Sequence, residues 1–149
     1  MSAQAGLELP AFYSYHDAPV KLVEATDGGV TAWKLSRDSG GWLPANHLIR
    51  KLLFESSGEI ERLTREEFIQ LTEHCRGYYL RGDSALHALY ETVRAIEENQ
   101  ARERRYPTEK EVSLVREIHR RTFVIFEEGL LAGGDPAADP SLGGADTRR

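Results

Sequence analysis

Apolar positions near the start of the chain follow the pattern of a β-hairpin. Val20, Leu22 and Val23 lead into Thr26-Asp27-Gly28-Gly29, and the β-prone run 30–35 follows. Asp-Gly between two such runs favours a tight turn, because that turn needs positive φ angles. This predicts strands over about 19–25 and 30–36. Aromatic and small residues alternate over 11–15, which favours a short or edge strand.

Farther along, apolar residues recur at helical spacing and predict three or four helices. Pro44 suits the first turn of the first helix, and residues 59–63 fit either a strand or a turn. Thr64 with Glu67, and Thr108 with Glu111, match the capping box that begins a helix. The predicted core consists of Val20, Leu22, Leu48, Leu52, Phe68, Leu71, Leu89, Val93, Val115, Ile118, Phe123 and Phe126.

These elements predict one α+β domain in two layers, an N-terminal antiparallel β-hairpin or three-stranded sheet packed on three to four amphipathic helices. We expect a flexible N-terminus over 1–10, the domain over 11–131 and a disordered tail over 132–149. The tail has no apolar periodicity and one large apolar residue, Leu142. Such a segment buries too little surface to offset its ordering entropy.

Composition narrows the class of protein without naming an activity. The chain has 149 residues, a net charge of −5 and a single cysteine, Cys75. One cysteine cannot form an internal disulfide, and residues 1–10 lack the basic and apolar regions of a signal peptide. No apolar stretch is long enough for a membrane span. We therefore expect a soluble cytoplasmic protein that does not associate with membranes.

Candidate catalytic and metal-binding groups are sparse. Asp83, His87 and Glu91 share one line on a helix, which could serve an acid–base or hydrolytic enzyme, but we favour a solvated row of charge pairs. His74 and Cys75 are adjacent, so they point about 100° apart and would not readily share a metal. No serine elbow and no phosphate-binding glycine motif occurs. We expect no metal and no cofactor, and we favour a protein that is not an enzyme.

His119 lies inside the apolar stripe of the last helix, between Val115 and Phe123. A histidine in this position is more often a satisfied core residue than a ligand. Burial would disfavour its charged form, so it could titrate in the folded protein.

Arginines cluster before and on the last helix, and Arg104, Arg105, Arg116 and Arg120 could bind a nucleic acid or another phosphate ligand. Acidic residues nearly balance the basic ones between residues 91 and 121, however. Mixed charge of this kind is typical of a solvated surface or the rim of a protein interface. Nucleic-acid binding is therefore an alternative that we do not favour.

Aromatic residues gather in the first third of the chain, and not all of them can face inward from alternating strands. Tyrosine and tryptophan are enriched at binding hot spots. Apolar residues also fall on the otherwise charged side of the last helix. The predicted protein interface comprises Tyr13, Tyr15, Trp33, Trp42, Val124 and Leu131. The leading hypothesis is a small non-enzymatic protein-interaction module, an adaptor, inhibitor or subunit of a larger assembly, whose partner is another protein or a second copy.

Overall fold

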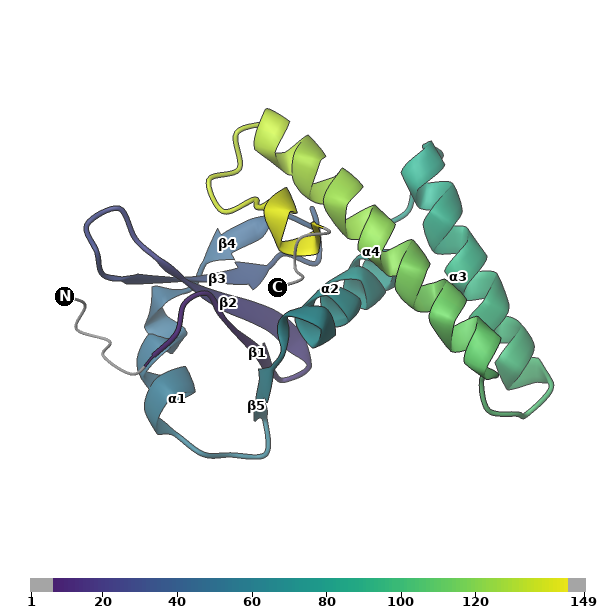
Figure 1. The fold of residues 1–149 in the computed structure, drawn as a ribbon, viewed down its shortest axis with the longest axis horizontal. Coiled ribbons are helices and arrows are strands. Elements are labelled where there is room, and N and C mark those ends of the chain that lie inside the picture. The colour runs from purple at the N-terminus through teal and green to yellow at the C-terminus, as the bar shows by residue number, and fades with distance from the viewer. Residues whose placement is uncertain (1–6, 145–149) are drawn as a thin grey trace.

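A computed structural model describes residues 7–144 and shows an α+β fold (Figure 1). Five strands form one antiparallel sheet in the order β4-β3-β2-β1-β5. They are β1 (Ala11–Tyr15), β2 (Ala18–Glu24), β3 (Val30–Leu35), β4 (Trp42–Pro44) and β5 (Ile60–Leu63). The α+β class is thus confirmed, with a larger sheet than the predicted hairpin or three-stranded arrangement.

Between residues 7 and 144, six helical elements complete the fold. They are η1 (Asn46–Leu48), α1 (Ile49–Phe54), α2 (Arg65–Tyr79), α3 (Ala85–Arg102), α4 (Glu109–Ala132) and η2 (Pro140–Gly143). The predicted capping boxes are present: Thr64 and Thr108 each accept from the amide three residues ahead, and Glu67 and Glu111 reach back. These local contacts fix where α2 and α4 begin.

The sheet is covered on both faces, so the expected two layers become three (Figure 1). Side chains alternate across a strand. Tyr13, Val20 and Leu22 pack with Leu48 and Leu52 of the η1–α1 segment on one face. The other face packs against α2, α4 and the segment after α4, in a cluster formed by Phe12, Leu35, Trp42, Phe68, Ile69, Phe123, Ala137 and Leu142.

One local prediction was wrong. Pro44 ends strand β4 and does not begin a helix. It is tolerated there because β4 is an edge strand, where a missing N–H breaks no ladder. The turn at Asp27-Gly28 was placed correctly, and Gly28 has the positive φ that the turn requires.

The disordered tail was predicted to begin at residue 132, which is too early. Residues 133–144 fold back onto the sheet and α4, and Leu142 is only 4 % exposed. The backbone N–H of Trp42 donates to Asp135 Oδ2 at 3.1 Å, which ties this segment to β4. The predicted flexibility of residues 1–6 and the predicted disorder of residues 145–149 lie outside the described residues. Leu7 and Leu9 pack against the core.

Three helices form an extension at one side of the sheet. α2 contacts the sheet at its start, and α3 and α4 run side by side beyond it (Figure 1). α4 packs on both α2 and α3, which buries Ile118, Thr122 and Phe123. The opposite side of α4 faces outward.

Candidate functional site

A network of buried charges joins α2, α4 and the sheet. The Arg76 guanidinium donates to Glu73 at 2.8 Å and to Glu127 at 2.6 Å, and all three side chains are fully buried. Arg76 also donates to the carbonyl of Gly40 at 2.7 and 3.0 Å. The fork of the guanidinium thus bridges two helices and the loop before β4.

Further donors satisfy the two carboxylates. Tyr90 and Thr122 each donate to Glu73 at 2.7 Å, and the Trp42 indole N–H donates to Glu127 at 3.0 Å. Burial raises the pKa of Glu73, a shift that the neighbouring Arg76 opposes. Each carboxylate thus accepts from several buried donors, and the network ties α2, α3 and α4 to the start of β4.

Lys21 extends the network on the helix side of the sheet. Its ammonium donates to the Ala137 carbonyl at 2.5 Å and lies 4.5 Å from the centre of the Trp42 ring. Burial lowers the pKa of Lys21, and the nearby carboxylate of Glu127 opposes that shift. The lysine therefore joins β2 to the segment after α4.

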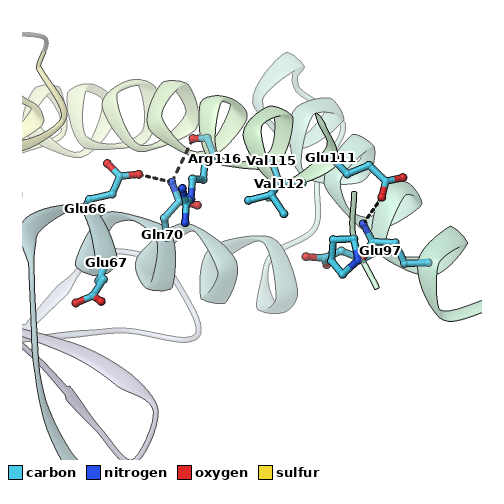
Figure 2. Close-up of a pocket in the computed structure, with 10 residues that line it drawn as sticks. Glu66, Glu67, Gln70, Glu97, Glu111, Val112, Val115 and Arg116 are labelled. Carbon is cyan, nitrogen blue, oxygen red and sulfur yellow. Dashed lines mark hydrogen bonds between the residues drawn. The ribbon is translucent and has the colours of Figure 1, made fainter. Parts of the chain in front are cut away.

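A cleft of about 380 Å³ lies between α2 and α4, with Pro107 and residues of α3 at one end. Figure 2 shows Gln70 of α2 reaching across it to the Arg116 carbonyl, with Val112 and Val115 on the α4 side. The lining is acidic, with glutamates at 66, 67, 97 and 111.

Most of those glutamates are already engaged. Glu66 accepts from Gln70 and Arg120, and Glu67 accepts at the N-cap of α2. Arg105 binds Glu111 bidentately and lowers its pKa to about 2. Among residues 7–144, no group of three or more histidine, cysteine or acidic side chains could hold a metal ion.

His119 lies beside this cleft and matches its prediction as a buried residue, with 4 % exposure. Its Nδ1 is 2.7 Å from the Gln70 amide oxygen, so Nδ1 donates. Burial, with a smaller contribution from His74, lowers the pKa of His119 to about 4. The imidazole is therefore neutral near pH 7.

Of Asp83, His87 and Glu91, the last two have local partners of their own. His87 Nδ1 pairs with Ser84 Oγ at 2.9 Å at the start of α3, and Glu91 is bound by Arg94 at 2.7 Å. None of the three lines the cleft between α2 and α4. Burial raises the pKa of the Cys75 thiol, which disfavours the reactive thiolate form.

The predicted phosphate-binding arginines are dispersed. Arg105 is paired with Glu103 and Glu111, and Arg120 with Glu66 and Glu117. Arg104 lies in the turn before α4 with a positive φ, and Arg116 is exposed on α4. Two of the four cations therefore already have carboxylate partners, which a phosphate would have to displace.

Most of the predicted aromatic interface lies inside the fold. Tyr13 and Trp42 are each 5 % exposed, and Tyr15 and Trp33 are half-buried. Neither Tyr13 nor Trp42 can contact a partner while the domain stays folded. The physical reason is the third layer, since the sheet buries side chains on both of its faces.

The two predicted interface residues on α4 lie elsewhere. Leu131 is 54 % exposed and Val124 half-buried, both on the outward side of the helix. Leu114 and Ile125 are exposed on the same side, at 48 % and 46 %. We call this side, defined by Leu114, Glu117, Arg121, Val124, Ile125, Glu128 and Leu131, the outer face of α4.

An open groove of about 670 Å³ runs along this face. Leu89 of α3, Ile125 and Val124 of α4, and Gly143 of η2 form its apolar part, and Arg120, Arg121 and Glu117 provide charge. The groove is bounded by α3 on one side and η2 on the other. It offers an apolar surface with a charged margin, which is the usual composition of a protein interface.

Comparison of the chain with protein-family models, with curated proteins and with solved structures returns no match. No helix in the described part of the chain is both long and apolar enough to cross a bilayer.

Several buried polar residues were missed by the sequence pattern. The sequence places the apolar stripe of α2 on Phe68, Leu71, Thr72, Cys75 and Tyr79. Phe68 and Thr72 are buried as expected, but the other buried residues of the helix are Ile69, Glu73 and Arg76. Their spacing of three and four is itself helical, but two of them are charged. Only the partners on α3, α4 and the β4 loop make such burial tolerable.

Proposed function

We propose that this chain is a non-enzymatic protein-interaction module, an adaptor, inhibitor or small subunit, that binds a protein through the outer face of α4. The observation that supports it is the apolar groove beside Ile125 and Val124, continued along the helix by Leu114 and Leu131. Single exposed apolar side chains are common on any protein. A set gathered along one helix face and a groove is more typical of an interaction surface.

The other exposed large apolar side chains are spread over several elements. They are Leu43 on β4, Phe54 on α1, the adjacent Tyr78 and Tyr79 on α2, Tyr106 before α4, and Val112 at the cleft between α2 and α4. Buried charged side chains such as Arg76 and Glu73 already form ion pairs and hydrogen bonds within the domain. A cytoplasmic location, which the single cysteine favours, and a regulatory role belong to the same proposal.

The test is capture of partners on immobilised protein, quantified by mass spectrometry, with wild type and two variants. Ile125→Glu places a charge in the groove, where burying it against a partner is costly, so the captured partner should be reduced at least about tenfold. Phe54→Glu is the matched control, because Phe54 is 78 % exposed on α1, across the sheet from α4 (Figure 1). It should leave capture unchanged.

Equal capture by wild type and Ile125→Glu would remove the outer face of α4 from the proposal. Thermal unfolding of each variant shows whether the domain remains intact. A chain that captures nothing and does not self-associate would contradict an interaction role altogether.

The alternative of a nucleic-acid or phosphate-ligand binder keeps one feature in its favour, the exposed Arg116 and Arg121 on α4. It predicts binding to a nucleic acid that weakens steeply with salt and drops in Arg116→Ala. The pairing of Arg105 and Arg120 with carboxylates favours the protein-interaction proposal over it.

A further inference from the structure

We propose that the outer face of α4 pairs with the same face of a second copy of this chain, with the two helices antiparallel about a two-fold axis. The inference rests on the proposed function and names the partner. It follows from the order of charged and apolar residues along the exposed side of one helix.

Seven residues of α4 recur at alternating steps of four and three, which is the spacing of the contact positions of a coiled coil. They are Lys110, Leu114, Glu117, Arg121, Val124, Glu128 and Leu131. Six of them are exposed and Val124 is half-buried. The domain therefore leaves six of the seven seam positions exposed, with η2 against Val124, while the opposite side of α4 packs on α2 and α3.

One antiparallel register matches every charge on this seam. With the two-fold axis level with residue 119, Lys110 faces Glu128 of the second copy. Leu114 faces Val124, and Glu117 faces Arg121. Symmetry makes each pair occur twice, giving four ion pairs and two apolar pairs along a seam of about 27 Å.

Other arrangements place like charges together. In a parallel pair, each seam residue meets its own copy, so Glu117 would face Glu117 and Arg121 would face Arg121. Sliding the antiparallel pair by one heptad puts Glu117 against Glu128 in one direction and Lys110 against Arg121 in the other. Like charges at facing positions are destabilising, so the sequence selects the first register.

The charges on the seam are largely free to make these contacts. Within residues 7–144, Lys110, Arg121 and Glu128 form no ion pair. Glu117 has one, to Arg120 at 3.2 Å, and both side chains are substantially exposed. Arg120, which lies off the seam, is also held by Glu66 of α2.

A second helix on the seam would also border the groove, because Glu117, Arg121 and Val124 line it. Ile125 and Leu89 would then lose solvent exposure at the edge of the interface. Polar residues at seam positions set register and orientation at a cost in stability. We therefore expect a reversible dimer and not a permanent one.

The mass of the purified full chain in solution tests the pairing. Sedimentation equilibrium up to about 100 µM should show a species of about 34 kDa, twice the 16.8 kDa of one chain, in exchange with monomer. Glu117→Arg sets arginine against Arg121 of the second copy, and Arg121→Glu sets glutamate against Glu117. Each should weaken dimerisation at least about tenfold.

Combining the two substitutions exchanges the partners and restores opposite charges. The double variant should recover dimerisation to within about threefold of wild type. Arg116→Glu is the matched control, since Arg116 is exposed on α4 but off the seam, and its dimer should match wild type. Far-ultraviolet circular dichroism and thermal unfolding identify any variant that fails to fold. If a charge-reversal variant does not fold, Arg121→Ala takes its place and should also weaken the dimer.

Three results would overturn the pairing: a monomer at every concentration, single variants that dimerise like wild type, or no recovery in the double variant. A monomeric chain that still captures a protein lost in Ile125→Glu would overturn the pairing and leave the proposed function standing. A monomeric chain that captures nothing would overturn both.

Discussion

At the scale of single residues, Arg76 is the largest fully buried side chain among residues 7–144. It is 1 % exposed, and its guanidinium bonds to Glu73, Glu127 and the Gly40 carbonyl. Desolvation disfavours each of these charges alone, and only their mutual contacts offset it. Arg76 thus connects α2 and α4 to the loop that leads into β4.

Arg76→Met should lower the free energy of unfolding by about 3–5 kcal/mol, because it leaves two buried carboxylates without their cation. Urea unfolding at pH 7 measures this. Adding Glu73→Gln restores charge balance, since Lys21 and Glu127 remain, and should recover a substantial part of the loss. A double variant no more stable than Arg76→Met would show that lost packing, and not uncompensated charge, causes the defect.

His119 gives the fold a dependence on pH. Its pKa of about 4 lies below the ordinary value of 6.5, so the unfolded chain takes up its proton first as pH falls. The stabilising contribution is therefore complete above pH 6.5 and is lost as pH falls toward 4. His119→Asn keeps a donor toward Gln70 without this titration.

Between pH 7.5 and pH 5, wild type should lose about 2 kcal/mol more stability than His119→Asn. Urea unfolding of both proteins at the two pH values gives the difference directly. Parallel pH profiles for the two proteins would mean that His119 does not remain neutral in the fold.

At the scale of elements, the sequence predicts best what is decided locally. The Asp27-Gly28 turn and the capping boxes at Thr64 and Thr108 depend on residues at most three positions apart, and all three are present. β4 was missed because three residues carry too little pattern to distinguish a strand from a helix start. It exists because it pairs with β3.

The buried side of α2 and the packed segment after α4 depend on distant partners. Glu73 and Arg76 are buried because Glu127 lies 51 residues beyond Arg76 in sequence and 2.6 Å from it in space. Leu142 alone could not order residues 133–144, but Lys21 and Trp42 supply hydrogen-bond partners for them. No local pattern contains this information.

The candidate site was predicted in part, for a similar reason. Helical phase alone places Val124 and Leu131 on the outward side of α4, where they are found. Tyr13 and Trp42 were assigned to a surface because the sequence indicated one covered face of the sheet. The η1–α1 segment covers Tyr13 on one face, and α2, α4 and the segment after α4 cover Trp42 on the other.

At the scale of the whole molecule, the segment 133–144 joins parts that would otherwise touch weakly. Ala137 accepts from Lys21 of β2, and Asp135 accepts from the amide of Trp42 in β4. The Asp139 amide donates to Glu127 of α4 at 2.7 Å. The segment therefore connects the sheet to the helix that carries the proposed interface.

A chain ended at Ala132 should lose at least about 4 kcal/mol of stability. It exposes the site filled by Leu142 and leaves Lys21 and Glu127 each short of a hydrogen bond in a buried position. Leu142→Ala tests the apolar part alone and should cost about 2–3 kcal/mol, because it opens a cavity against Phe123 and its neighbours. Urea unfolding of both proteins beside wild type measures the two losses.

The truncated chain should also capture less of the partner protein, since η2 forms one wall of the groove on α4. If the truncated chain has the same free energy of unfolding as wild type, residues 133–144 do not stabilise the fold, and the helices alone form the outer face of α4.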